Sequence, residues 1–229
     1  MSGADKVSSV LVKRTMIRGI VLLVLSLVLI VSVFPPLESI DYVFYVLSSR
    51  FNVAPEVFLM VIDLLLLLAG YWLAASLYSF LSIGRTLSES LASGCSRLSS
   101  VNKTLNKRGW TSLILAVAII VFWHVPTILD AALLSFQLHL IMHTSMLLSG
   151  ILIYAGFRML PPNMRLLSYL LGCKGMAIFG AFLLVTPIAV YGSYPFYEQA
   201  EAGAAMVAMC VASDATIIPI WLRRYFGRR

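Results

Sequence analysis

The chain has 229 residues, of which 60% are apolar and only 12% are charged, and its formal net charge is +7. Soluble domains are about 45–50% apolar and about 25% charged, so this composition, with a mean hydropathy of +0.94, indicates an integral membrane protein. It excludes a disordered segment, a collagen-like fibre and a disulfide-rich secreted module. It also argues against a nucleic-acid partner, because membrane topology can account for the basic residues.

Six stretches are apolar enough to cross a lipid bilayer, since a spanning helix needs about 20 mainly apolar residues. In chain order they are 17–37, 57–83, 110–129, 138–160, 166–191 and 200–222. We therefore predict an all-α, polytopic bundle of about six transmembrane helices, forming a single integral membrane domain over residues 1–229. The first stretch ends in Phe34-Pro35-Pro36-Leu37, which lacks the small residues of a signal-peptide cleavage site, so we expect it to remain as a helix.

The basic residues gather on one side of the predicted membrane. Fifteen of the 17 lie before the first span or in its first turn, after the second span, in the last turn of the fourth or just beyond it, or at the end of the chain. Only Arg50 and Lys174 do not fit this pattern. By the positive-inside rule, both termini of a multi-pass cell-membrane protein are then cytoplasmic. The longest cytoplasmic connection, 85–109, carries an apolar residue every three or four positions. That spacing is typical of an amphipathic interfacial helix, although a solvated Ser-rich loop is the alternative.

Four ionisable residues are predicted to meet in the outer leaflet. Counting 1.5 Å per residue from the ends of the spans places Asp63, His124 and His143 about 9 Å below the outer boundary. His139 lies one turn from His143 on the same helix face. Ionisable groups in hydrocarbon are costly and so mark a candidate site, and imidazoles with a carboxylate suit a transition metal. The alternative is that these side chains only hydrogen-bond neighbouring helices.

Other side chains lie near this layer. Met142 could favour Cu(I), although methionine in an apolar helix usually serves packing. Glu198 and Glu201, at the outer end of the last span, could complete the site or could simply be solvated acids that suit a helix N-terminus. Pro126 follows His124 by two residues, and either bends the helix and so orients the histidine or ends the helix.

A second polar layer is predicted nearer the cytoplasm. Lys174 is nine residues beyond Arg165, and Asp214 is nine residues before Arg223, so both lie about 13 Å from the inner boundary. We predict an intramembrane ion pair between them. The alternatives are that Lys174 extends to the inner surface, or that both residues belong to a proton path.

The three cysteines are expected to have no special chemistry. Cys95 faces the cytoplasm, whereas Cys173 and Cys210 lie on different spans, and no CxxC or CxxxC pair occurs that would carry copper or a disulfide. We therefore expect small buried apolar residues.

Three motifs carry a resemblance to a known family: Trp123-His124-Val125-Pro126, His139-Leu140-Ile141-Met142-His143 leading to Gly150, and Tyr197-Glu198-Gln199 with Gly203 and Met206. Together they resemble the CtaG family of cytochrome c oxidase assembly proteins over roughly residues 110–225. The chain looks more similar to an archaeal branch of uncharacterised members than to the bacterial assembly factors. The resemblance implies a metal-binding role for the histidines and a function in oxidase assembly.

These observations lead to the hypothesis of a non-enzymatic membrane protein that holds copper near the extracytoplasmic face. It would assist the assembly of a respiratory terminal oxidase or belong to that complex. His124, His139 and His143 would be ligands, with Asp63 as a fourth ligand or as an acceptor for an imidazole N–H. The sequence contains no GxSxG, P-loop or HExxH motif that would indicate an enzyme.

Two alternatives stay open. His124 and His143 could be axial ligands of a haem b in a membrane redox subunit. Alternatively, Asp63, Lys174 and Asp214 could line the route of a small-solute or proton-coupled transporter.

Overall fold

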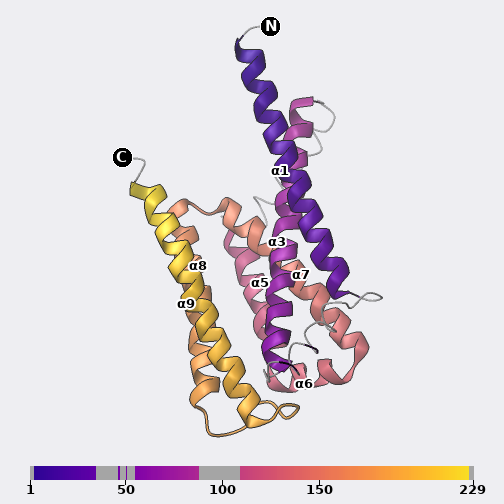
Figure 1. Ribbon diagram of the computed structural model, residues 1–229, viewed down its shortest axis with the longest axis vertical. Coiled ribbons are helices and arrows are strands. Elements are labelled where there is room, and N and C mark those ends of the chain that lie inside the picture. Colours follow the sequence, from indigo (N-terminus) through magenta and orange to yellow (C-terminus); the bar gives the residue numbers. More distant parts are fainter. Residues whose placement is uncertain (1–2, 35–45, 47–49, 51–54, 88–108, 227–229) are drawn as a thin grey trace. The chain divides into compact units, whose positions relative to one another are not determined.

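The computed structural model describes residues 3–34, 46, 50, 55–87 and 109–226, and over these residues the regular structure is helical throughout (Figure 1). The helices are α1 (Gly3–Val33), α3 (Pro55–Leu87), α5 (Trp110–Trp123), α6 (Pro126–Leu134), α7 (Phe136–Met159), α8 (Pro162–Val185) and α9 (Phe196–Phe226). Five of them are long and apolar enough to cross a membrane, and the bent pair α5–α6 would make a sixth span. The predicted all-helical membrane fold is thus confirmed.

Two predicted helix ends are wrong, and proline explains both. The predicted span 110–129 breaks after Trp123, and α6 begins at Pro126 in a direction 69° away from α5. Proline has no N–H to continue a helix but fits well at the first position of a new one. The span predicted to reach residue 191 ends at Val185, where Thr186 is extended (φ −70°, ψ 129°), as expected for a residue that precedes proline.

The chain divides into two compact units. The first contains residues 1–40, 63–122 and 139–160, and the second contains residues 41–62, 123–138 and 161–229. The predicted single domain over residues 1–229 stays a prediction. Residues 88–108 lie outside the described part of the chain, so the amphipathic helix expected in 85–109 also stays a prediction.

In the first unit, α1 and α3 are joined by two hydrogen bonds between small side chains and backbone carbonyls. Ser26 Oγ donates to the carbonyl oxygen of Ala69, and Ser76 Oγ donates to that of Gly19, each over 2.8 Å. Both serines are fully buried. Serine serves well between membrane helices, because it is small enough for close approach and its hydroxyl supplies an interhelical hydrogen bond.

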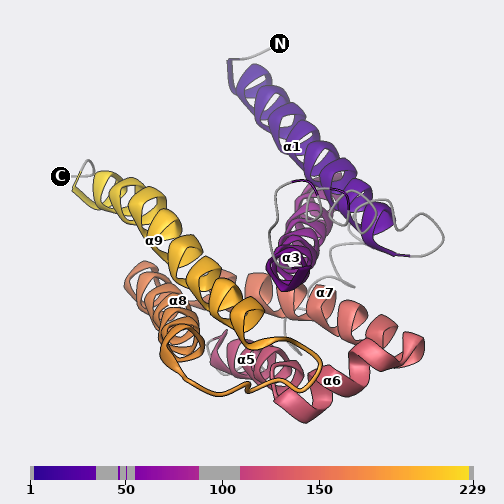
Figure 2. The ribbon, with the colours of Figure 1, turned by 60° about the horizontal axis from the view of Figure 1, so that its bottom comes forward.

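In the second unit, α8 and α9 run side by side, as both ribbon views show (Figures 1 and 2). Glycines permit this packing, since a Cβ placed on Gly180 would lie 2.7 Å from the carbonyl oxygen of Gly203. Leu183, Tyr191 and Met206 form the buried core beside this contact.

Candidate functional site

Helices α3 and α7 of the first unit touch backbone to backbone through two glycines. A Cβ on Gly150 would lie 2.9 Å from the carbonyl carbon of Leu67 and 2.9 Å from the nitrogen of Tyr71, and a Cβ on Gly70 would lie 3.0 Å from the carbonyl carbon of Leu147. Further along, the rings of Tyr71 and Tyr154 are 5.2 Å apart. Contacting residues on the two helices therefore differ in number by about 80, and the numbers rise together, so α3 and α7 are parallel.

This register sets Asp63 level with His143. The two residues differ by 80 positions, and each lies seven residues before the contact glycine of its own helix, Gly70 or Gly150. Seven residues are two helical turns, so each side chain projects from the same face as its glycine. Asp63 and His143 thus lie at the same level on the contacting faces of α3 and α7, and their depth in a membrane stays a prediction.

Both side chains carry a buried polar atom without a partner. His143 is 3% exposed, and neither its Nε2 nor Asp63 Oδ1 makes a hydrogen bond. Buried polar atoms are nearly always paired, and an unpaired one costs about 1–3 kcal/mol. Two such atoms on contacting helices indicate a site at which a bound proton, water molecule or metal ion would supply the missing partner.

Aromatic rings enclose the buried imidazole of His143. The ring of His139, one turn earlier on α7, lies 4.3 Å from that of His143 at 63°, and the ring of Phe34 lies 6.0 Å away at 77°. The neighbouring Met142 is fully buried. The predicted pairing of the two histidines on one helix face is therefore present in the structure.

His124 belongs to the second unit and lies at the break between α5 and α6. Its ring centroid is 6.4 Å from that of Phe179, and its carbonyl oxygen accepts a 2.9 Å hydrogen bond from the hydroxyl of Tyr191. The predicted depth of 9 Å assumed a straight helix to Asp130. The helix breaks at this point instead, and the depth of His124 in a membrane stays a prediction. Of the two alternatives for Pro126, the structure shows the second, because α5 ends at Trp123 and a new helix, α6, begins at Pro126.

The acidic and amide residues at the start of α9 have local partners in the second unit. Glu198 accepts a hydrogen bond from the hydroxyl of Tyr197 over 3.0 Å, and Glu201 is exposed. Gln199 is 2% exposed and binds the connection before α9: its Oε1 accepts from the nitrogen of Val190 over 2.7 Å, and its Nε2 donates to the carbonyl oxygen of Tyr194 over 3.0 Å. Gln199 therefore fixes the path of this connection, a role that sequence reasoning missed.

Asp130 and Tyr191 complete the same polar connection. The carboxylate of Asp130 accepts hydrogen bonds from the nitrogens of Gly192 and Ser193, each over 3.1 Å. Burial of the Tyr191 hydroxyl, together with the nearby charge of Asp130, raises the pKa of Tyr191 to about 12. The phenol therefore stays protonated at neutral pH and donates its proton to the backbone of His124.

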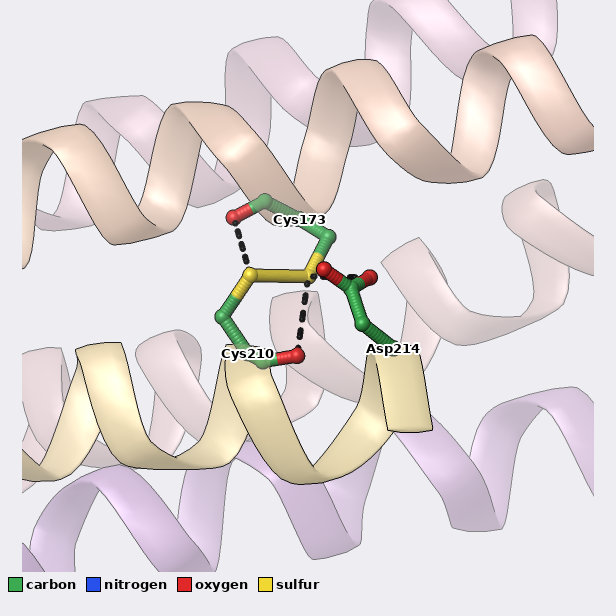
Figure 3. Close-up of side chains that lie close together, drawn as sticks. All are labelled: Cys173, Cys210 and Asp214. Atoms are coloured by element: carbon green, nitrogen blue, oxygen red, sulfur yellow. Dashed lines mark hydrogen bonds between the residues drawn. A yellow bond between two sulfur atoms is a disulfide. The ribbon is translucent and has the colours of Figure 1, made fainter. Parts of the chain in front are cut away.

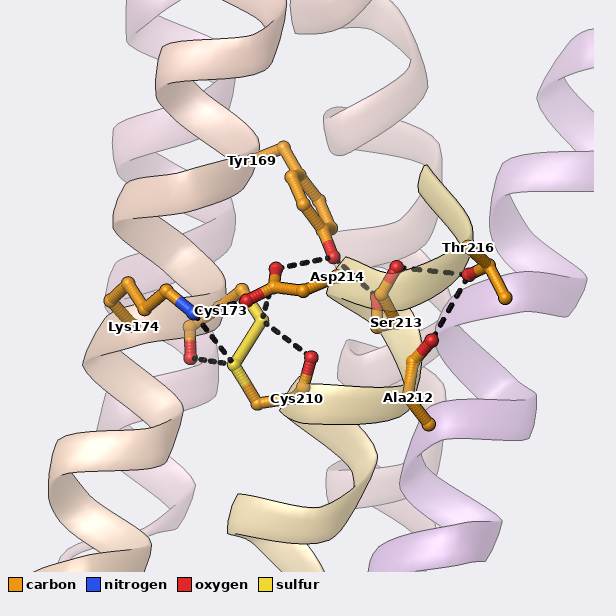
Figure 4. Close-up of a disulfide and its surroundings, with 8 residues drawn as sticks. All are labelled: Tyr169, Cys173, Lys174, Cys210, Ala212, Ser213, Asp214 and Thr216. Atoms are coloured by element: carbon orange, nitrogen blue, oxygen red, sulfur yellow. Dashed lines mark hydrogen bonds and ion pairs between the residues drawn. A yellow bond between two sulfur atoms is a disulfide. The ribbon is translucent and has the colours of Figure 1, made fainter. Parts of the chain in front are cut away.

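The predicted ion pair on α8 and α9 is also present. Lys174 Nζ and Asp214 Oδ2 are in contact, with the lysine side chain 52% exposed and the aspartate side chain 17% exposed (Figure 4). The hydroxyl of Tyr169 donates to Asp214 Oδ1 over 3.1 Å and lies 2.5 Å from Ser213 Oγ. Asp214 is thus held by a cation on one side and by a hydroxyl pair on the other.

The expectation that Cys173 and Cys210 are inert is wrong. They form a disulfide between α8 and α9, with a Cα–Cα distance of 5.7 Å, and Asp214 lies beside it (Figure 3). The search for CxxC motifs failed because the partners are 37 residues apart on two helices. A usable signal was present, since Cys173 adjoins Lys174 and Cys210 is one turn before Asp214, so a Lys174–Asp214 pair brings the cysteines together. Cys95 lies outside the described residues.

The sulfur atoms and Asp214 are also the closest set of metal-binding side chains in the described part of the chain. One ligand atom from each of Cys173, Cys210 and Asp214 lies within 4.8 Å of the others. Asp63, His139 and His143 do not form a group this tight. Imidazole and carboxylate groups nevertheless suit a metal by type, and two of the atoms, His143 Nε2 and Asp63 Oδ1, are buried without a hydrogen-bond partner.

The family model described as a protein of unknown function, DUF1404, matches residues 24–226. No curated protein and no solved structure was found to match the chain.

Proposed function

The chain belongs to the DUF1404 family, and we propose that it is a copper-binding protein of the cell membrane that assists the assembly of a respiratory terminal oxidase or belongs to that complex. The ion would be held near the extracytoplasmic face by His139 and His143, with Asp63 as a further ligand or as the acceptor for an imidazole N–H. His124, the other ligand predicted from the sequence, belongs to the second unit and stays a prediction.

One observation carries the metal site. The facing positions of α3 and α7 hold a buried imidazole nitrogen and a buried carboxylate oxygen, neither of which has a hydrogen-bond partner. A merely structural histidine would be expected to bond a carbonyl or the facing carboxylate. A metal ion would accept both lone pairs and would remove the cost of burying them unpaired.

The resemblance to the CtaG family supports copper and oxidase assembly as the more specific reading. It rests on the HxxxH pair, on Gly150 and on the residues that open α9. Copper suits this donor set, because imidazole is a good ligand for it and a thioether such as that of the neighbouring, buried Met142 favours Cu(I). An archaeal origin belongs to the same proposal.

The orientation of the protein follows from its charges. We propose that both termini are cytoplasmic, since the basic residues flank the cytoplasmic ends of the predicted spans. A fluorescent protein that matures only in the cytoplasm should then fluoresce when it is fused to either terminus. Fluorescence from one fusion alone would contradict an even number of spans.

Copper content tests the proposed ligands. The full chain is loaded with Cu(I) in the presence of a competing chelator, and the bound copper is measured. The Cys173–Cys210 disulfide is kept oxidised so that the cysteine sulfur atoms do not bind copper. We expect about one ion per chain, lost in the variant His139→Ala/His143→Ala and reduced in Asp63→Asn.

Thr144→Ala is the matched control, because Thr144 follows His143 on α7 but is exposed and bonds only the carbonyl oxygen of Leu140 in its own helix. It should keep its copper. Equal copper in the wild type and the double histidine variant would refute the site. A Soret band at one haem per chain would replace copper by haem b, with His143 as an axial ligand.

A further inference from the structure

The Cys173–Cys210 pair has the surroundings of a reactive disulfide. Its sulfur atoms lie between the two long helices α8 and α9, and each contacts a charged side chain: Asp214 Oδ1 is 3.7 Å from Cys173 Sγ, and Lys174 Nζ is 3.8 Å from Cys210 Sγ (Figures 3 and 4). We propose that these cysteines form a redox couple that exchanges two electrons with a lipid-soluble quinone inside the membrane.

The two charged groups supply what thiol chemistry needs. A thiol reacts as its thiolate, which a neighbouring cation stabilises, and the proton must go to a base. Asp214 adjoins Cys173 and accepts this proton, and Lys174 then stabilises the negative charge on the sulfur pair. Because the proton moves from sulfur to carboxylate within the cluster, the net charge stays zero at each stage, which the membrane interior favours.

The reaction balances with a quinone as the oxidant. The two thiols lose two protons and two electrons, two S–H bonds break, and the S–S bond forms. The quinone takes up both protons and both electrons and becomes the hydroquinone. In the reverse direction, the hydroquinone reduces the disulfide.

The surface of α8 around Cys173 is not covered by other atoms of the described residues. Gly172 and Gly175 flank the Cys173-Lys174 dipeptide on α8, both are exposed, and a Cβ on either would meet no described atom within 4 Å. Glycine inside a helix costs roughly 0.5–1 kcal/mol relative to alanine, and no close packing explains it at these two positions. Together with the half-exposed Lys174, the glycines leave room for a flat ring to approach the sulfur atoms. A purely structural disulfide would need neither the room nor the charges.

A direct test uses the full chain with Cys95→Ser in lipid nanodiscs, so that Cys173 and Cys210 are the only thiols. The protein is reduced, freed of reductant without oxygen, and mixed with a short-chain ubiquinone. Quinone loss is followed by absorbance, and free thiols are counted by maleimide–polyethylene glycol labelling. We expect two thiols to disappear for each quinone reduced, and no quinone loss in Cys173→Ser or Cys210→Ser.

Two variants separate this role from a structural one. Lys174→Met should slow oxidation by the quinone by about tenfold or more, since fewer chains carry the thiolate, while Lys174→Arg restores most of the rate. Gly172→Phe should slow the quinone but not the small oxidant diamide, because it fills the approach to Cys173. A thermal melting transition like that of the wild type, in every variant that keeps both cysteines, shows that these chains are folded.

Several results would overturn the proposal. A disulfide that no reductant opens in the folded chain would be structural. Thiols that diamide oxidises but the quinone does not would point to a protein partner instead. Retention of one zinc ion per reduced chain, with quinone oxidation blocked, would make Cys173, Cys210 and Asp214 a metal site. The copper test leaves the disulfide oxidised, so either proposal can fail without the other.

Discussion

Replacement of Gly150 by alanine should destabilise the protein, although alanine is the better helix former. The added Cβ would lie 2.9 Å from the carbonyl carbon of Leu67 and 2.9 Å from the nitrogen of Tyr71, and it would also contact the Leu67 oxygen. All three atoms belong to the backbone of α3, which cannot move aside as a side chain can. The helices must separate, and overpacking of this kind costs about 1–3 kcal/mol, against a gain of roughly 0.5–1 kcal/mol from helix propensity.

The net loss should be visible in thermal unfolding of the purified protein. For a chain of this length, 1 kcal/mol corresponds to about 2–4 °C in Tm, so Gly150→Ala should lower the Tm by several degrees. Gly175→Ala is the matched control on α8, because its Cβ would meet no described atom within 4 Å, and its Tm should stay equal or rise slightly. Gly150→Ala with an unchanged Tm would refute the backbone contact between α3 and α7, and with it the register that sets Asp63 level with His143.

Three further predictions concern the second unit. Gln199→Leu should cost about 2–3 kcal/mol, because it leaves buried groups of the connection before α9 unpaired, and an unchanged Tm would count against this role. Lys174→Met should lower the Tm in detergent, because it leaves the carboxylate of Asp214 without its cation. The double variant Lys174→Met/Asp214→Leu, which also removes the carboxylate, should recover part of this loss. No recovery would mean that Lys174 stabilises the protein mainly by packing. Raising the pKa of Tyr191 above its usual value of about 10 stabilises the folded state below pH 10, and this stabilisation is lost as the pH rises toward 12. The Tm of the wild type should therefore fall more steeply than that of Tyr191→Phe between pH 10 and 12. The extra loss of folding free energy should be at most about 3 kcal/mol. Equal dependence of the two Tm values on pH would contradict the raised pKa.

Hydropathy was sufficient to predict the membrane helices but not where their backbones break. Apolar residues continue through Pro126 and beyond Val185, so composition alone extended both spans too far. Proline at residues 126 and 187 contains the missing information, since its lack of an N–H and its effect on the preceding residue act on the backbone and not on hydropathy. The depth counted for His124 assumed that its helix continues past Pro126, whereas Asp63 and His143 lie on the unbroken helices α3 and α7.

The disulfide was missed for a different reason. Sequence motifs for cysteine chemistry are defined along one segment, and Cys173 and Cys210 become neighbours only through the antiparallel packing of α8 and α9. Their charged neighbours were correctly paired from depth alone. Because Cys173 adjoins Lys174 and Cys210 lies one turn before Asp214, the predicted ion pair already indicated that the two cysteines lie close together.

A single spacing rule accounts for both polar pairs, one in each unit. Each residue of a pair lies seven positions, or two helical turns, from the glycine at which its helix meets the other. The four spacings are Asp63 to Gly70, His143 to Gly150, Cys173 to Gly180 and Gly203 to Cys210.

The order within these spacings follows from helix direction. In the parallel helices α3 and α7, both polar residues precede their glycines, whereas in the antiparallel helices α8 and α9 one precedes and the other follows. Two residues at the same level must lie on the same side of their glycines in sequence when the helices are parallel, and on opposite sides when the helices are antiparallel. On α8 and α9 the rule brings the cysteines to a Cα–Cα distance of 5.7 Å, so the matching spacing on α3 and α7 supports treating Asp63 and His143 as chemical partners. Glycine at these positions therefore does more than permit packing, because the contact it allows fixes which residues of the two helices lie at the same level.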